Sequence, residues 1–241
     1  MTRPHLINNL HFVTYFENEF GFGFKNEKYI CFFGNAKTEL PQLHSLFPSI
    51  EFFRVKQTHS DIVVESKVSL TGDSLTEADA HWTSKANKAL LIATADCMPI
   101  MIYCKQTNRA AAVHAGWRGV VKRITEKTLQ CLIETGSTEK NFDIFIGPSI
   151  QQESFEVDSD VYEKLILSTV DVKPTEYSYN LNNKYYINLN KIVLNQIDSI
   201  TKANSHVSFS EIDTKKILNY RSYRRDKLRA ERNLSFICLL T

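Results

Sequence analysis

The pattern of apolar and polar positions is clearest in the middle of the chain, where three apolar runs follow one another. Residues 89–95 form the most apolar stretch, and its length and flanks predict a fully buried strand. A second run covers residues 98–104, and a third covers residues 109–114 after the polar segment 105–108. Because that segment is short enough for a hairpin loop, we expect the second and third runs to pair antiparallel.

Shorter runs of aromatic and β-branched residues predict further strands. These runs lie at residues 11–15, 29–33, 51–55, 62–64, 142–146 and 234–240. Gly21 and Gly23 indicate a turn between the first two runs, and the polar connection at residues 35–48 has room for a short helix. Residues 173–184 are polar and rich in Asn and Tyr, which favours a loop.

Helices are expected in the second half of the chain. Residues 120–134 carry an apolar stripe at helical spacing, with Cys131 in the stripe and Gly136 as the natural stop. Cys131 is therefore interpreted as a packing residue. Two further helices begin at polar residues of the type that caps helix N-termini. These caps are Asp158 and either Asn188 or Asn190.

The predicted hairpin has a geometric consequence for two reactive side chains. If Cys104 pairs with Arg109 across the loop, Pro99 pairs with His114. Cys97 shares a face with Pro99, so Cys97 and His114 become diagonal neighbours with Cβ atoms under about 7–8 Å apart. Since Pro99 has no N–H, the pairing is irregular there. A zinc ion bound about 2.3 Å from sulfur and about 2.0 Å from nitrogen bridges such a gap.

Composition places the chain among soluble globular proteins. Its 241 residues are enough for one domain or two small ones, and 43% are hydrophobic and 23% charged. A net charge of +2 gives no electrostatic argument for binding to nucleic acid or membranes. No run approaches the roughly 18 apolar residues of a membrane span.

Cysteine usage indicates a reducing compartment. The chain has five cysteines, an odd number, and no CxxC pair. The N-terminus leads into no uninterrupted apolar stretch, so we expect no secretory signal and a cytoplasmic location. No structural disulfide is expected among the cysteines other than Cys97. Those four are Cys31, Cys104, Cys131 and Cys238.

Several candidate functional residues lie together where the third apolar run ends. His114, Gly116, Arg118 and Gly119 lie within six residues, between a predicted strand and a predicted helix. The glycines allow a sharp turn or a close approach to a ligand, and helix N-termini attract anions. The alternative is a strand-to-helix turn with an incidental histidine.

His59, Cys97 and His114 together offer two imidazoles and a thiolate. Three such ligands with an open fourth position describe a catalytic zinc site, although a lone His59 beside a strand is also consistent with a structural role. Cys97 with His114 alone fits a nucleophile and its base. Three arginines could hold phosphate through charge-assisted hydrogen bonds. The alternative interpretation is that they form a solvated basic face. They are Arg118, Arg224 and Arg225.

An ordered set of short motifs resembles one known family, the YfiH-like laccase-domain family, also called polyphenol oxidase or peptidoglycan editing factor. The resemblance covers the chain from about residue 50 to its end. Its motifs are Lys56-Gln57-Thr58-His59, Ala78-Asp79-Ala80, Thr94-Ala95-Asp96-Cys97-Met98-Pro99, His114-Ala115-Gly116-Trp117-Arg118-Gly119, Ile146-Gly147-Pro148 and Ser222-Tyr223-Arg224-Arg225-Asp226.

This resemblance implies an α/β fold, a four-layer α/β/β/α sandwich with mixed sheets, in a single domain at residues 1–241. It implies zinc bound by His59, Cys97 and His114. Arg118, close to His114 in sequence, is the nearest candidate for a second cation and completes the expected catalytic set. The implied activity is purine nucleoside phosphorylase. Adenosine, inosine, guanosine or S-methyl-5'-thioadenosine would react with phosphate to give base and a ribose 1-phosphate. Adenosine deamination is a second family activity.

Several alternatives remain beside that function. An older family label is copper-dependent polyphenol oxidation, which a site of three scattered ligands suits less well than zinc chemistry. A cysteine hydrolase using Cys97 and His114, or a non-catalytic protein that binds nucleoside or a partner, is also consistent with the sequence. The oligomeric state is open.

The sequence departs from the family pattern around the expected ligand-binding residues. The family's Thr-Arg-x-Gly-Gly-Val-Ser stretch corresponds to residues 14–24, which contain no arginine. Its Gly-Pro-Cys segment ends here in Ser149, and its C-terminal Gly-Arg is Glu231-Arg232. Because the three predicted metal ligands are intact, we expect this protein to differ from other family members in activity level and substrate preference rather than in metal binding.

Overall fold

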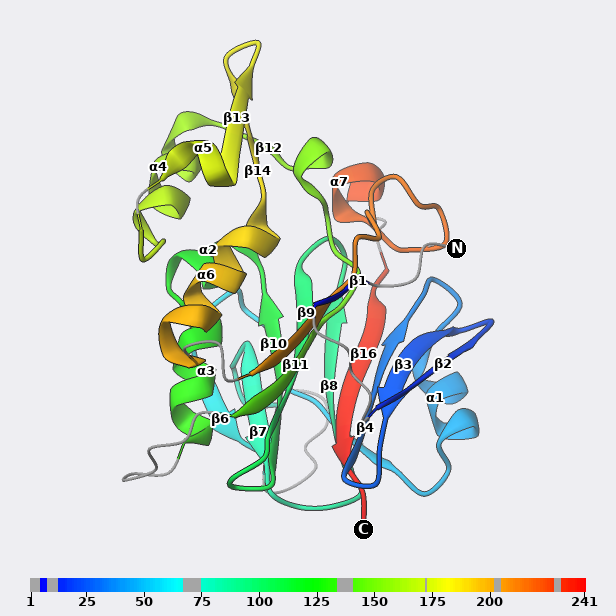
Figure 1. The fold of residues 1–241 in the computed structure, drawn as a ribbon. Helices are drawn as coiled ribbons and strands as arrows, with labels where there is room; N and C mark the ends of the chain where they lie inside the picture. The colour runs from blue at the N-terminus through cyan, green and yellow to red at the C-terminus, as the bar shows by residue number, and fades with distance from the viewer. Residues whose placement is uncertain are drawn as a thin grey trace.

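The computed structural model describes residues 5–7, 13–66, 75–133, 141–171, 173–201, 205–227 and 231–241. Its strands form two large mixed sheets and one small sheet (Figure 1). In spatial order, the first sheet consists of β1 (His5–Ile7), β15 (His206–Phe209), β11 (Phe142–Ile146), β9 (Met98–Cys104), β10 (Arg109–Ala115), β7 (Ala80–Thr83) and β6 (Val63–Glu65). Its β11–β15 and β6–β7 pairs are parallel, and its other pairs are antiparallel.

The second large sheet pairs strands from the N-terminal part of the chain with the C-terminal strand. In spatial order it consists of β2 (Thr14–Asn18), β3 (Gly21–Lys25), β4 (Tyr29–Gly34), β16 (Asn233–Leu239), β8 (Lys88–Thr94) and β5 (Glu51–Phe53). Only its β5–β8 pair is parallel. The small sheet consists of β12 (Glu156–Val157), β14 (Lys184–Ile187) and β13 (Ser178–Leu181).

Helices cover the outer faces of the two large sheets. On the first sheet lie α2 (Trp117–Val121), α3 (Ile124–Leu132) and α6 (Leu189–Thr201), and on the second lies α1 (Leu40–Leu46). A further helix, α4 (Ser159–Leu167), contacts α2 and β14 of the small sheet. Shorter helical segments are a 3₁₀ turn at Gln152–Ser154, α5 (Pro174–Tyr177) and α7 (Tyr223–Asp226). Figure 1 shows α3 and α6 on one side of the sheets and α1 on the other. This four-layer arrangement confirms the α/β/β/α sandwich with mixed sheets.

The inner faces of the two sheets share an aromatic core. Phe145 of β11 stacks on Phe24 of β3 with ring centroids 4.8 Å apart, and Tyr29 of β4 lies 4.7 Å from Tyr103 of β9. Every residue of β9 is buried, which explains its continuous apolar sequence, because both of its faces are covered. Among the helices described, none is long and apolar enough to cross a membrane.

Several predicted elements are confirmed. The buried strand at residues 89–95 is β8, and the two runs after it form the β9–β10 hairpin. The hairpin register is the predicted one, with Cys104 opposite Arg109 and Pro99 opposite His114. Asp158 and Asn188 each directly precede a helix, and the Asn188 side chain caps it by accepting a hydrogen bond from the Lys191 N–H at 2.9 Å. The Asp158 side chain makes no capping hydrogen bond and pairs with Lys184 at 2.5 Å instead.

Other predictions are wrong for local reasons. The helix expected over residues 120–134 breaks into α2 and α3, because Arg123 adopts the left-handed conformation with φ +61°. Cys131 is exposed rather than packed, and Gly136 lies outside the described residues. The expected loop at residues 173–184 contains α5, β13 and the start of β14.

The turn expected at Gly21 and Gly23 is also wrong, because both glycines lie within β3. A Cβ atom at Gly23 would lie 2.2 Å from the Cys31 carbonyl oxygen, so the missing side chain serves close packing there. Of the strand expected at residues 11–15, residues 11 and 12 lie outside the described residues, and β2 begins at Thr14. All five cysteines are free.

Candidate metal centre and substrate pocket

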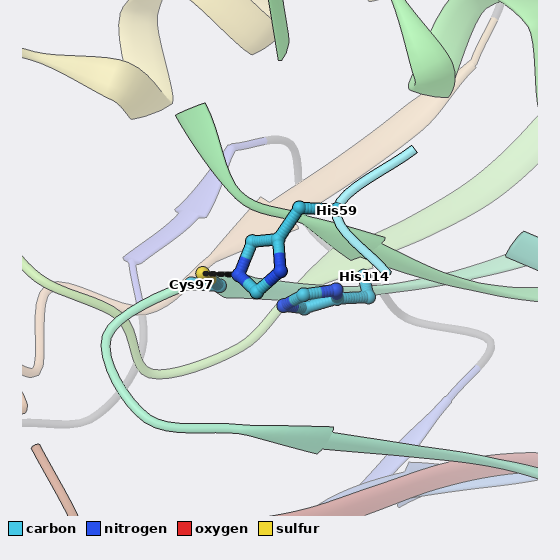
Figure 2. Close-up of side chains that lie close together, drawn as sticks. All are labelled: His59, Cys97 and His114. Carbon is cyan, nitrogen blue, oxygen red and sulfur yellow. Dashed lines mark hydrogen bonds between the residues drawn. The ribbon is translucent and has the colours of Figure 1, made fainter. Parts of the chain in front are cut away.

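His59, Cys97 and His114 come together although 55 positions separate the first from the last. One ligand atom from each of the three side chains lies within 4.8 Å of the others. The two imidazole rings meet edge to face with centroids 4.8 Å apart, and the Cys97 sulfur lies 3.9 Å from Nε2 of His59 (Figure 2). The structure therefore brings these three predicted site residues into one cluster.

Two of these side chains, Cys97 and His114, lie at the ends of strands, and His59 lies in a loop. His114 is the second-last residue of β10, and Cys97 directly precedes β9. The turn between β8 and β9 contains Asp96 with φ +83°, a conformation that short polar side chains tolerate better than most residues. Cys97 therefore lies in this turn rather than in a strand, and it reaches His114 from the end of the hairpin.

Asp79 organises the loop that carries His59. This loop lies between β5 and β6, and His59 itself has φ +59°. The buried Asp79 carboxylate accepts hydrogen bonds from three consecutive backbone N–H groups. Their donors are Thr58 (3.1 Å), His59 (3.0 Å) and Ser60 (2.6 Å). These bonds hold the His59 backbone in its uncommon conformation.

Asp79 also holds His114. The Nδ1–H of His114 donates to the Asp79 carboxylate at 2.7 Å, and the His114 backbone N–H donates to the Asp79 carbonyl at 2.7 Å. Because Nδ1 is occupied, Nε2 is the His114 nitrogen left for a ligand. One buried carboxylate thus sets the positions of both histidines.

Gln57 ties the same loop to the second sheet. Its Nε2 donates to the Ala93 carbonyl at 2.8 Å, and its Oε1 accepts from the Ala93 N–H at 2.9 Å. The side-chain amide therefore bonds to the backbone of β8 much as a neighbouring strand would. The His59 loop is fixed to one sheet through Gln57 and to the other through Asp79.

Electrostatics within the cluster favour a thiolate. Burial raises the pKa of Cys97, but hydrogen bonds from His114 and His59 outweigh that effect and lower the pKa to about 6. Burial lowers the pKa of His114, but hydrogen bonds to Asp79 and Cys97 raise it to about 9. Burial raises the pKa of Asp79, and hydrogen bonds from His114 and Ser60 hold it well below its usual range. Without a metal, the cluster is therefore an ion pair.

The donor set fits a metal ion. A thiolate and two imidazole nitrogens are ligands that zinc accepts, and three protein ligands leave a fourth position for a small molecule. Binding would release the proton of His114, as is usual when a protonated ligand takes up a metal. His114 is 4% exposed and Cys97 is half-buried, while His59 is exposed, so the cluster is closed on one side and accessible on the other.

The cluster lines a pocket of about 840 Å³. Basic side chains outnumber acidic ones in its wall. The basic residues are Arg54, Lys56, Arg118, Arg224, Lys227 and Arg232, and the acidic one is Asp96. The Asp96 carboxylate already accepts hydrogen bonds from the Thr214 hydroxyl at 2.7 Å and the Arg224 N–H at 2.6 Å. The pocket therefore suits an anionic ligand.

The structure separates the three arginines proposed for phosphate. Arg118 and Arg224 both line the pocket. Arg225 does not, because its guanidinium donates to the carbonyls of Thr214, Lys215 and Tyr220 and pairs with Asp226 at 2.8 Å. The hypothesis that Arg225 binds phosphate is wrong, and so is its alternative of a solvated basic face.

Sequence reasoning missed some residues of this site. Arg54, Lys227 and Arg232 line the pocket from three separate segments, and no spacing in the sequence relates them. The role of Asp79 did have a signal. An acidic residue directly before a short strand is placed at the end of the sheet, and Ala80 pairs with Val113, next to His114.

The fold and the site define a class of protein, namely α/β/β/α sandwiches with a metal-compatible His/Cys/His cluster in a basic pocket. The chain belongs to the family described as multi-copper polyphenol oxidoreductase laccase, whose family model matches residues 38–240. The YfiH-like family resemblance of the sequence is thereby confirmed.

Relatives of known name cover much of the chain. A purine nucleoside phosphorylase of Clostridium acetobutylicum is 29% identical over 89% of this chain and 93% of its own length. Another from Haemophilus influenzae is 32% identical over 70% of this chain and 67% of its own length. The crystal structure of YlmD from Geobacillus stearothermophilus superposes with a TM-score of 0.81 at 19% identity, covering 94% of this chain and 99% of that one.

Proposed function

We propose that this protein is a zinc-dependent purine nucleoside phosphorylase of the cytoplasm, with adenosine deamination as a side activity. Its substrates would be inorganic phosphate and adenosine, inosine, guanosine or S-methyl-5'-thioadenosine. The observation that carries the proposal is the pocket itself, in which a His/Cys/His cluster and arginines line one cavity of about 840 Å³. The names of the relatives support the same reaction.

His59, Cys97 and His114 are proposed as the zinc ligands. When bound, zinc supplies a positive centre that polarises a substrate oxygen. Asp79 holds two of the ligands in place, so the cluster is preorganised before substrate enters. Elemental analysis distinguishes zinc from copper, which is the metal of the polyphenol oxidase alternative. We expect about one zinc per chain, as for a three-ligand catalytic site.

Arg118 is proposed to bind the phosphate. Its guanidinium lies over the Trp117 ring, 4.5 Å from the centroid, which limits its freedom while leaving its N–H groups available. In the reaction a phosphate oxygen forms a bond to the anomeric carbon of the ribose, and the bond from that carbon to the purine nitrogen breaks. The purine keeps the electron pair and takes the phosphate proton. Catalysis then rests on positioning and electrostatics.

The test is chromatography of adenosine incubated with the zinc-loaded protein, with and without phosphate. We expect adenine and ribose 1-phosphate only when phosphate is present. Arg118→Ala should raise the KM for phosphate roughly 10- to 100-fold, since a hydrogen bond to a charged group contributes about 1.5–3 kcal/mol. Lys164→Gln, on α4 and outside the pocket, should leave the KM for phosphate unchanged. Inosine formed equally with and without phosphate would make deamination the principal activity.

A cysteine hydrolase is the second candidate, favoured by the lowered pKa of Cys97 beside His114. The two functions differ in what metal removal does. A hydrolase nucleophile would remain active in metal-free protein and would be inactivated by alkylation. A zinc enzyme would lose activity with its metal and regain it when zinc is restored. Full zinc retention in His59→Ala, Cys97→Ala and His114→Ala would contradict the ligand assignment.

A further inference from the structure

The pocket contains more positive charge than the proposed reaction uses. A nucleoside is neutral, and one phosphate would be held by Arg118 and a metal. Arg224 and Lys227 also line the pocket, and within the part of the chain that the structure describes neither side chain forms an ion pair with a carboxylate. We call these two residues, which belong to α7 and its C-terminal end, the α7 basic pair.

Arg224 is rigidly presented to the pocket. Its backbone N–H donates to the Asp96 carboxylate at 2.6 Å, next to Cys97, and its guanidinium lies 5.7 Å from the centroid of the Phe155 ring. The neighbouring Arg225 fixes the segment by donating to three backbone carbonyls, and the Ser222 hydroxyl accepts from the Arg225 N–H at 3.2 Å. Arg224 is therefore preorganised, which reduces the entropic cost of binding an anion.

Arg118 and the α7 basic pair approach the cavity from different elements. Arg118 is on α2 and Arg224 is on α7, and Figure 1 shows these helices apart from each other at the same end of the sheets. Both arginines line the same pocket as the His/Cys/His cluster. The pocket therefore has two cationic regions rather than one.

The rest of the lining suits a purine nucleoside between these regions. Apolar and aromatic side chains contribute to the same wall, among them Trp117, Ile150, Phe155 and Leu189. A volume of about 840 Å³ lies in the upper part of the roughly 300–1,000 Å³ range of small-molecule pockets. A ligand larger than a nucleoside, with an anionic group at the end away from the reacting phosphate, matches this lining.

We propose that the α7 basic pair is a second anion site that binds the 5'-phosphate of a purine nucleoside 5'-monophosphate. This inference rests on the proposed function for the reaction, but the binding step does not depend on turnover. With such a substrate, a phosphate oxygen bonds to the anomeric carbon, the carbon–nitrogen bond breaks, and the purine leaves with the electron pair and the phosphate proton. The products are the free base and ribose 1,5-bisphosphate.

The experiment measures binding of adenosine 5'-monophosphate and adenosine to the zinc-loaded protein by calorimetry, in buffer without phosphate. We expect the monophosphate to bind at least about tenfold more tightly, since hydrogen bonds to charged groups are stronger than those between neutral groups. Arg224→Gln should remove this preference and leave adenosine binding unchanged. Lys227→Gln should reduce the preference, Arg224→Lys should keep part of it, and Lys164→Gln should keep it entirely.

The outcomes separate this inference from the proposed function. Equal binding of both ligands, or a preference that survives Arg224→Gln and Lys227→Gln, overturns the second anion site. A preference lost in Arg118→Gln but kept in Arg224→Gln also overturns it, because the 5'-phosphate would then occupy the Arg118 site. If adenosine is cleaved but the monophosphate binds no better, the inference fails and the proposed function stands. If neither ligand is cleaved but the preference for the monophosphate still depends on Arg224, the second anion site stands and the proposed function fails.

Discussion

Asp79 is the residue on which the geometry of both histidines depends. A buried carboxylate is costly unless its oxygens are hydrogen-bonded, and here backbone N–H groups and the His114 imidazole satisfy it. Those same bonds hold the left-handed backbone at His59 and select the nitrogen that His114 presents. The same hydrogen bonds therefore satisfy the buried carboxylate and position the proposed metal ligands.

Asp79→Asn is predicted to weaken zinc binding roughly 10- to 100-fold, the usual effect of losing a partner of a metal-bound histidine. An amide places N–H donors against the backbone N–H groups that now meet a carboxylate, so the His59 loop loses its anchor. Competition with a chromophoric chelator measures the dissociation constant. Asp213→Asn is the control, since Asp213 is also buried but bonds to Ser154 outside the cluster. Equal loss of affinity in both variants would contradict a positioning role.

The Cys97 thiol is predicted to react with iodoacetamide in metal-free protein with a midpoint near pH 6. Because its pKa is lowered to about 6, the thiolate is present above that pH and lost as the pH falls through it. Mass spectrometry of peptides separates Cys97 from the exposed Cys131. Removing either imidazole, in His59→Ala or His114→Ala, should move the midpoint upward. A wild-type midpoint at the pH of an ordinary thiol would refute the ion pair.

At the scale of elements, the site is built from turns that strands hold in place. The β9–β10 hairpin could be predicted with its register, because a short polar segment between two apolar runs leaves few ways to pair them. Cys97 and His114 could therefore be brought together from the sequence. The His59 loop could not, because side-chain bonds from Asp79 and Gln57 hold it rather than any periodic pattern.

Two further elements show where periodicity fails. The apolar stripe continues through Arg123, so the pattern did not predict that α2 ends before α3 begins. In the small sheet, stacked tyrosines at positions 179 and 186 stabilise a hairpin whose sequence is as polar as a loop. In both places, tertiary contacts and local backbone conformation outweigh the sequence pattern.

Gly116 joins β10 to α2, and its lack of a side chain is predicted to be required for the cluster. Its φ of −73° suits any residue, but an added Cβ atom would lie 3.0 Å from the Cys97 sulfur and 3.0 Å from Cδ2 of His59. Overpacking costs about 1–3 kcal/mol, so Gly116→Ala should raise the zinc dissociation constant roughly tenfold. Gly119→Ala, within α2, would place its Cβ 3.2 Å from the Ile124 side chain and 3.4 Å from the Ser60 carbonyl without touching a ligand atom, so it should raise the dissociation constant less than Gly116→Ala does.

At the scale of the whole molecule, the two large sheets depend on one another. The C-terminal strand β16 lies in the second sheet between β4 from the N-terminal part and β8 from the middle of the chain. The inner face of that sheet packs its aromatic residues on β9, β10 and β11 of the first. The turn that carries Asp96 and Cys97 connects the two sheets, so the geometry of the cluster depends on how the sheets pack.

We therefore propose that residues 1–241 unfold as a single domain, and Phe145→Ala tests this. Phe145 is 1% exposed and contacts Phe24 and Tyr29 across the sheet interface. Truncating such a buried ring costs about 3–5 kcal/mol of unfolding free energy. Hydrogen exchange in increasing denaturant should show that Phe145→Ala lowers the free energy of opening of the β9 and β16 amides by equal amounts. Tyr223→Ala, at a side chain that is 48% exposed, should leave the unfolding midpoint unchanged. Loss of protection confined to the first sheet, or two separate transitions, would show that the sheets unfold independently.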